Sequence, residues 1–176
     1  MAASRFSALV SALLVASVAA LEAKSIQDKD WVHLRHAVSG LYFKDVESAG
    51  AHKGWPHGRL GMPVGKFQIE LFSSGGEVHG DALLRLKSNT TSKPGYNYMF
   101  PSAHGAVYFG EDEYVHEEQW WKVSKVAGVR GDVLRSGDTV TIANAHSEGA
   151  YLAKAFEDYV YALDMEDKWV IELADK

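Results

Sequence analysis

The fold is decided by a short stretch near the C-terminus, Trp169-Val170-Ile171-Glu172-Leu173. Its first residue is aromatic and its third is β-branched, and a strand places these two side chains on the same face. The same pattern occurs twice earlier, as Phe67-Gln68-Ile69-Glu70-Leu71 and Trp121-Lys122-Val123-Ser124-Lys125. Self-similarity of this kind predicts three copies of one structural unit, each ending in this strand.

The strands that precede each copy also recur. A first strand alternates apolar and polar residues in all three units, at Val32-His33-Leu34-Arg35-His36, Leu84-Arg85-Leu86-Lys87-Ser88 and Val140-Thr141-Ile142-Ala143-Asn144. A second strand follows a short polar turn and carries Tyr42, Tyr98 or Tyr151. A third strand is clear at 107–109 and 160–162, whereas the glycine- and histidine-rich stretch 51–61 blurs it in the first unit.

Four strands in each of three units predict an all-β fold with twelve strands, a β-trefoil over residues 31–173. A single four-strand unit cannot bury its apolar face, but three units around a pseudo-threefold axis bury one shared core. We therefore expect Phe67, Trp121 and Trp169 at equivalent buried positions, and the three tyrosines at equivalent core positions. An immunoglobulin-like sandwich or another small barrel would not require an aromatic residue at the same step of each third.

The N-terminal segment predicts an export signal. Arg5 provides a positive charge, and the apolar run from Phe6 to Ala20 is too short to span a bilayer comfortably. Val18 and Ala20 supply the small residues of a signal-peptidase site, so we expect a signal peptide at 1–20 and a single domain at 21–176. The alternative is a buried N-terminal helix. We expect the mature protein in the secretory lumen or outside the cell, with no membrane span.

The composition excludes several function classes. The 176-residue chain has no cysteine, so disulfides, zinc–thiolate sites and thiol catalysis are excluded. Its 18 Lys and Arg against 23 Asp and Glu argue against nucleic acid as a partner. Asn89 begins a glycosylation sequon, Asn89-Thr90-Thr91, whose use depends on a eukaryotic source and an exposed loop.

Two motifs in the repeats resemble known trefoil families. The run Gly137 to His146, followed by Gly149-Ala150-Tyr151-Leu152, resembles the units of MIR-type and fascin-like domains. The step Gln119-Trp120-Trp121 is weakly similar to the Gln-x-Trp step of ricin-B-type lectins. These resemblances cover residues 31–173 and imply a β-trefoil, a fold that serves lectins, inhibitors, growth factors and actin bundlers alike.

No local motif predicts catalysis, a cofactor or a metal. Gly-x-Ser-x-Gly, His-Glu-x-x-His and Walker-type loops are all absent from the sequence. Eight histidines raise the question of a metal site, but His33 and His36 are three apart on a strand and face opposite ways. We expect surface histidines and a protein that is not an enzyme, although a calcium site in the acidic stretch 111–118 stays open.

The aromatic residues give a stronger functional lead. Strand alternation turns Trp120 outward beside Tyr114, His116 and Glu118, and the small neighbours of Trp55 cannot bury that ring locally. A flat ring near hydrogen-bond acceptors can stack on a sugar. The candidate ligand-binding residues are Trp55, Trp120, Asn144, His146 and Asp164. The alternative for each indole is a plug at one end of the barrel.

Two function classes stay open from the sequence. The first is a secreted, lectin-like module that binds a glycan or a glycoprotein through aromatic pockets. The second is a protein-binding or structural trefoil that presents loops from a rigid barrel. Sugar-dependent binding on a glycan array would separate the two, because only the first class predicts it.

Overall fold

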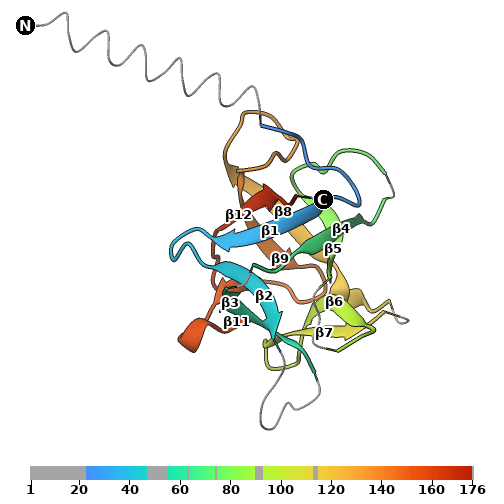
Figure 1. Cartoon of the computed structure of the whole chain (residues 1–176), viewed down its shortest axis with the longest axis vertical. Helices are drawn as coiled ribbons and strands as arrows, with labels where there is room; N and C mark the ends of the chain where they lie inside the picture. Colours follow the sequence, from blue (N-terminus) through green and yellow to red (C-terminus); the bar gives the residue numbers. More distant parts are fainter. Residues whose placement is uncertain are drawn as a thin grey trace, which may run out of the picture.

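The computed structural model describes residues 23–46, 55–62, 64–73, 75–89, 93–112 and 115–175. These residues form an all-β structure of twelve strands with short 3₁₀ turns (Figure 1). The predicted signal segment 1–20 lies outside the described residues. In the part described, no helix is both long and apolar enough to cross a membrane. The strands are β1 (Trp31–His36), β2 (Tyr42–Val46), β3 (His57–Gly61), β4 (Phe67–Leu71), β5 (Ala82–Ser88), β6 (Tyr96–Pro101), β7 (Val107–Glu111), β8 (Trp121–Ala127), β9 (Thr139–Asn144), β10 (Tyr151–Lys154), β11 (Val160–Leu163) and β12 (Trp169–Leu173).

Six of the strands close a barrel. The first and fourth strands of each unit pair antiparallel in the ring β1-β4-β5-β8-β9-β12, and β12 pairs with β1 to complete it. Closure leaves no open sheet edge in this layer, which suits a chain without disulfides. The predicted β-trefoil with three four-strand units is therefore confirmed.

The other six strands form three hairpins that cap the barrel, β2–β3, β6–β7 and β10–β11. The hairpins contact one another through backbone pairs at His57 with Tyr108, Arg59 with Tyr159, and Ala106 with Tyr161. The strand β3 occupies the place that β7 and β11 hold in the other units. Its glycines and histidines made it hard to recognise in the sequence. Glycine is required at Gly58, since a Cβ there would lie 2.5 Å from the Phe43 ring.

The three predicted core aromatics are equivalent and fully buried. Each begins the last strand of its unit, and Phe67, Trp121 and Trp169 are all 0% exposed. Their partners in the barrel ladder, Ser88, Asn144 and His36, are the last residues of the three first strands. The alternation read from the sequence therefore assigned these side chains to the correct face.

The far end of the barrel is closed by a ring of backbone hydrogen bonds. The amide of Ile26 donates to Leu134, that of Leu134 to Val78, and that of Val78 back to Ile26, over 2.7 to 2.9 Å. All three side chains are fully buried. The pseudo-threefold axis therefore passes through this ring, and the barrel needs no aromatic plug there.

The three predicted tyrosines are equivalent, but their expected burial is wrong for two of them. Tyr42, Tyr98 and Tyr151 occupy matching places opposite the first strand of each unit. Tyr98 is 6% exposed, whereas Tyr42 and Tyr151 are only partly buried. The following residue points into the core instead, because neighbouring side chains on a strand face opposite ways.

Candidate functional site

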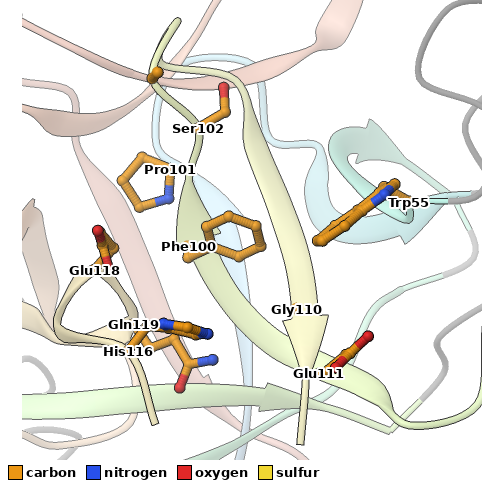
Figure 2. Close-up of a pocket in the computed structure, with 10 residues that line it drawn as sticks. Trp55, Phe100, Pro101, Ser102, Gly110, Glu111, His116, Glu118 and Gln119 are labelled. Atoms are coloured by element: carbon orange, nitrogen blue, oxygen red, sulfur yellow. The ribbon is translucent and has the colours of Figure 1, made fainter. Parts of the chain in front are cut away.

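A pocket of about 370 Å³ opens beside the β6–β7 hairpin (Figure 2). Its walls come from Trp55 just before β3, from β6 and β7, and from the segment around the 3₁₀ turn η2 (Glu117–Gln119). A volume of this size is in the range of small-ligand sites. The pocket brings together parts of the chain that are far apart in sequence.

Aromatic rings form the apolar side of the pocket. Trp55 is 44% exposed, and its ring lies edge-to-face against Tyr96 at 5.5 Å and Phe100 at 6.1 Å between centroids. These contacts fix the orientation of the indole and leave part of it exposed to solvent. Trp55 therefore lines the pocket and does not plug the barrel, and its stacking on a ligand stays a prediction.

Carboxylates dominate the polar side. Glu111 and Glu118 line the pocket with His116, and the described part of the lining contains no lysine or arginine. Glu111 accepts a hydrogen bond from the Tyr96 hydroxyl, so its carboxylate is held in place. Figure 2 shows Glu118 and His116 across the pocket from Trp55. The pocket lining thus combines aromatic surface with negative charge.

A cation lies beside the aromatic wall. The Lys93 ammonium is 3.6 Å from the centroid of the Tyr96 ring and 5.9 Å from that of Trp55. Cation–π attraction of this kind favours the position. Lys93 therefore places a positive charge near the Trp55 ring, beside the acidic lining, where a ligand bound against Trp55 can contact it.

The floor of the pocket contains an unsatisfied amide. Gln119 is 0% exposed, and neither its Oε1 nor its Nε2 has a hydrogen-bond partner among the described residues. Gly110 keeps space there, since a Cβ at this position would approach the Phe100 ring to 3.0 Å and Gln119 Nε2 to 3.7 Å. Leaving a buried polar group unpaired costs about 1 to 3 kcal/mol. The amide thus keeps unused hydrogen-bonding capacity beneath the pocket.

Asn144 positions this floor instead of facing a ligand. Its Nδ2 donates to the carbonyls of Glu118 at 2.8 Å and Trp120 at 3.3 Å, and its Oδ1 accepts from the amides of His146 and Ser147. The side chain is 4% exposed and uses both ends of its amide. Asn144 was predicted to offer hydrogen bonds to a ligand, but in the structure its amide bonds the segment around η2 with its Nδ2 and the β9–β10 turn with its Oδ1.

Trp120 lies on a different surface from the pocket. It is outside the core and only partly buried, as predicted, but its ring packs edge-to-face on Phe72 at 5.0 Å. The Arg85 guanidinium lies 5.1 Å from its centroid. The sequence predicted a platform beside His116 and Glu118, whereas the ring contacts found for Trp120 are with Phe72, just after β4, and with Arg85 of β5. Tyr114 lies outside the described residues.

The remaining predicted residues are exposed. His146 lies 3.3 Å from a carboxylate oxygen of Glu117 and 3.9 Å from one of Glu118, at the edge of the pocket segment. Asp164 is exposed after β11 and does not line the pocket. Asn89 is exposed directly after β5, as glycosylation would require, and the other two sequon residues lie outside the described residues.

Sequence reasoning missed Phe100, Glu111, Gln119 and Lys93. Two of these carried a signal in the sequence, Gln119 as the first residue of the Gln-x-Trp step and Glu111 at the start of the acidic stretch 111–118. Among the described residues, no group of three or more histidine and acidic side chains could hold a metal ion.

One chain of polar groups resembles a nucleophilic relay. Ser39 Oγ lies 2.7 Å from His36 Nδ1, and His36 Nε2 lies 2.9 Å from Asp167. Nδ1 also accepts the Ser39 amide at 3.1 Å, so the contact closes the turn between β1 and β2. Ser39 does not line the Trp55 pocket, and a triad needs a substrate site at its nucleophile. These contacts favour a structural role for His36.

The closed barrel with its three-hairpin cap defines the chain as a β-trefoil. In sequence it is similar to lysenin-related protein 3 of Eisenia fetida, with 33% identity over 150 residues, 82% of this chain and 43% of the relative. The chain spans less than half the length of the curated relatives it matches. No known family model matches the sequence.

Solved structures agree with the fold. A complex of lysenin with phosphocholine superposes with a TM-score of 0.67 at 27% identity, over 88% of this chain and 47% of lysenin. The SDF2-like protein from Arabidopsis thaliana gives a TM-score of 0.68 over 84% of this chain and 94% of its own. At 13% identity this second likeness concerns the fold alone. The MIR-type and fascin-like resemblances stay predictions.

Proposed function

We propose that this β-trefoil is a non-catalytic binding module that takes a phosphocholine-type head group in the Trp55 pocket. The observation that carries the proposal is the pocket lining, which joins exposed aromatic surface to Glu111 and Glu118. A quaternary ammonium is bound by aromatic faces and negative charge, and it needs no hydrogen bonds. The choline end of such a ligand therefore suits the pocket.

The phosphate end has a partner at the rim. Lys93 lies beside the faces of Tyr96 and Trp55, where a phosphate joined to a pocket-bound choline would reach. A lysine ammonium binds phosphate as a point charge. The similarity to lysenin, whose complex with phosphocholine is known, supports the same ligand class.

A glycan is the second candidate, because of Gln119. A sugar hydroxyl both donates and accepts hydrogen bonds, which is what the unpaired amide offers, and a sugar ring can stack on Trp55. With this second candidate the protein is a secreted, lectin-like module whose partners are glycans or glycoproteins. The protein-binding trefoil is the remaining alternative.

Calorimetric titration of the chain with phosphocholine, choline, inorganic phosphate and a panel of methyl glycosides tests these candidates. We expect phosphocholine to bind more tightly than either fragment, since it reaches both the pocket and Lys93. Binding of a glycoside with no response to phosphocholine would replace the proposal with the lectin. No response to any of these ligands would favour the protein-binding alternative.

A further inference from the structure

A second cavity lies at the end of the barrel opposite the cap. Its volume is about 500 Å³, and it lies between the segment that precedes β1 and the residues at the end of β12 and beyond. Ile26 of the same segment belongs to the ring of backbone bonds that closes this end. In Figure 1 the blue segment before β1 lies beside the red end of the chain, away from the cap strands β3, β7 and β11. We call it the barrel-end cavity and define it by Lys24, Asp30, Trp31 and Asp175.

Hydrogen bonds hold the walls of the barrel-end cavity. The Lys29 amide donates to the Ile69 carbonyl at 2.8 Å, and the Ala174 amide donates to the Trp31 carbonyl at 2.8 Å. Lys29 has a φ of 67°, in the left-handed region that non-glycine residues avoid. Strained backbone of this kind persists where surrounding contacts enforce it. The walls are therefore ordered before a ligand arrives, which lowers the cost of binding one.

Three side chains of the lining keep unused binding capacity. The Lys24 ammonium, the Trp31 indole and the Asp175 carboxylate have no hydrogen bond, ion pair or ring contact among the described residues. Lys24 and Asp175 are exposed and Trp31 is partly exposed, so a ligand can reach all three. The carboxylates of Asp28 and Asp30 line the same cavity, but both already accept backbone amides.

The two free charges have opposite signs and do not pair with each other. Lys24 and Asp175 line one cavity, yet within the described chain neither forms an ion pair. A ligand with a single charge would use only one of them. A ligand that carries both a carboxylate and an ammonium can pair with both, and its apolar part can lie against the Trp31 ring.

We propose that the barrel-end cavity binds a free α-amino acid, with its carboxylate at Lys24, its ammonium at Asp175 and its side chain against Trp31. A volume of about 500 Å³ is in the range of small-ligand sites. A primary ammonium has three N–H donors for a carboxylate, which a quaternary ammonium lacks. This ligand class is therefore different from the one proposed for the Trp55 pocket, and the inference does not depend on that proposal.

Nuclear magnetic resonance of the whole chain tests the inference through the indole N–H signals of Trp31 and Trp55. Trp31→Phe and Trp55→Phe identify the two signals. Phenylalanine should shift the Trp31 signal and leave the Trp55 signal in place. Phenethylamine lacks the carboxylate and phenylacetate lacks the ammonium, so each should bind about tenfold more weakly than phenylalanine.

Variants that remove one charge assign the two ends of the ligand. Lys24→Gln should weaken phenylalanine binding by about tenfold and leave phenethylamine binding unchanged. Asp175→Asn should weaken phenylalanine binding by about as much and leave phenylacetate binding unchanged. Lys168→Gln and Asp164→Asn are the matched controls, since both residues are exposed and lie outside the cavity lining. Both controls should bind phenylalanine like the wild type.

Three results would overturn the inference. The first is a Trp31 signal that does not move at millimolar phenylalanine. The second is equal binding of phenylalanine and its two fragments, or equal binding by Lys24→Gln, Asp175→Asn and the wild type. The third is a larger shift of the Trp31 signal by phosphocholine than by phenylalanine, because the cavity would then take a different zwitterion.

Discussion

The indole N–H of Trp121 donates a hydrogen bond to the carbonyl oxygen of Met99 at 3.0 Å. The third unit repeats the bond, from Trp169 to Leu152 at 2.8 Å. In the first unit phenylalanine has no N–H, and Phe67 instead stacks on Phe43 at 4.9 Å between centroids. The same two positions therefore tie the last strand of every unit to its cap hairpin.

Trp121→Ala should lower the free energy of unfolding by about 3 to 5 kcal/mol. The change leaves a cavity in the core and removes the indole that donates to the Met99 carbonyl. Urea unfolding measures the loss. Trp120→Ala is the neighbouring control, and it should cost about 1 kcal/mol because its ring packs only on the outer wall. A loss well under 1 kcal/mol at Trp121 would contradict the core assignment.

The architecture could be predicted from the sequence because it depends on a pattern that repeats in each third of the chain. An aromatic at the same step of each third, two residues before a β-branched partner, identifies the buried face of three strands at once. The pattern can still be recognised in the irregular first unit, because the last strand of that unit begins with Phe67 and keeps it, although β3 is irregular. Twelve strands and their division into units follow from it.

The pocket was not predictable in the same way, because its residues meet only through the cap. Trp55, which the sequence singled out by its small neighbours, lines the pocket, but Phe100 and Gln119 beside it are contributed by β6 and η2. For Trp120, strand alternation predicted the outward direction but could not predict the contact with Phe72, which follows β4. Asn144 was selected as a polar turn residue, yet its side chain bonds both the adjacent turn and the carbonyls of Glu118 and Trp120, which are distant in sequence.

Tyr98 should make the protein lose stability in alkali. Burial and the hydrogen bond to Glu70 raise the pKa of the Tyr98 hydroxyl to about 12. The folded state thus retains this proton more tightly than the unfolded chain, whose pKa is near 10. The stabilising contribution is complete below pH 10 and disappears as the pH rises toward 12. Tyr98→Phe should be less stable than the wild type at pH 8, and the gap should narrow by pH 11.5 in chemical unfolding. A gap that stays constant would contradict the assignment.

Asn144 variants should separate its two roles. Asn144→Asp retains an acceptor for the amides of His146 and Ser147 but cannot donate to the carbonyls of Glu118 and Trp120. Asn144→Ala removes both sets of bonds and should cost about 2 kcal/mol in thermal or urea unfolding. Both variants should weaken phosphocholine binding, because η2 carries the pocket floor. Full binding by Asn144→Asp would show that the floor is held by other contacts.

The N-terminal segment gives a prediction about processing. The apolar run ending at Ala20 predicts cleavage before Leu21. N-terminal sequencing of protein recovered from its native source should begin at or near this residue. Met1 retained on a cytosolic protein would reject both the signal and the extracellular location.

Trp55 should be required for ligand binding and dispensable for stability. Its ring is half in solvent and packs on Tyr96 and Phe100 at the pocket wall, away from the barrel core. Trp55→Ala should therefore weaken phosphocholine binding by about tenfold, the value of one good cation–π contact, with a melting temperature close to the wild type. Trp55→Phe keeps a ring and should lose less.

Trp120→Ala provides the comparison for that experiment, because Trp120 is an equally large ring on a surface without the pocket. It should bind phosphocholine normally in the same calorimetric titration. Suppose instead that Trp55→Ala unfolds several degrees earlier and still binds the ligand fully. The indole would then be a packing residue of the cap, and the head group would have to be sought away from the acidic pocket of Glu111 and Glu118.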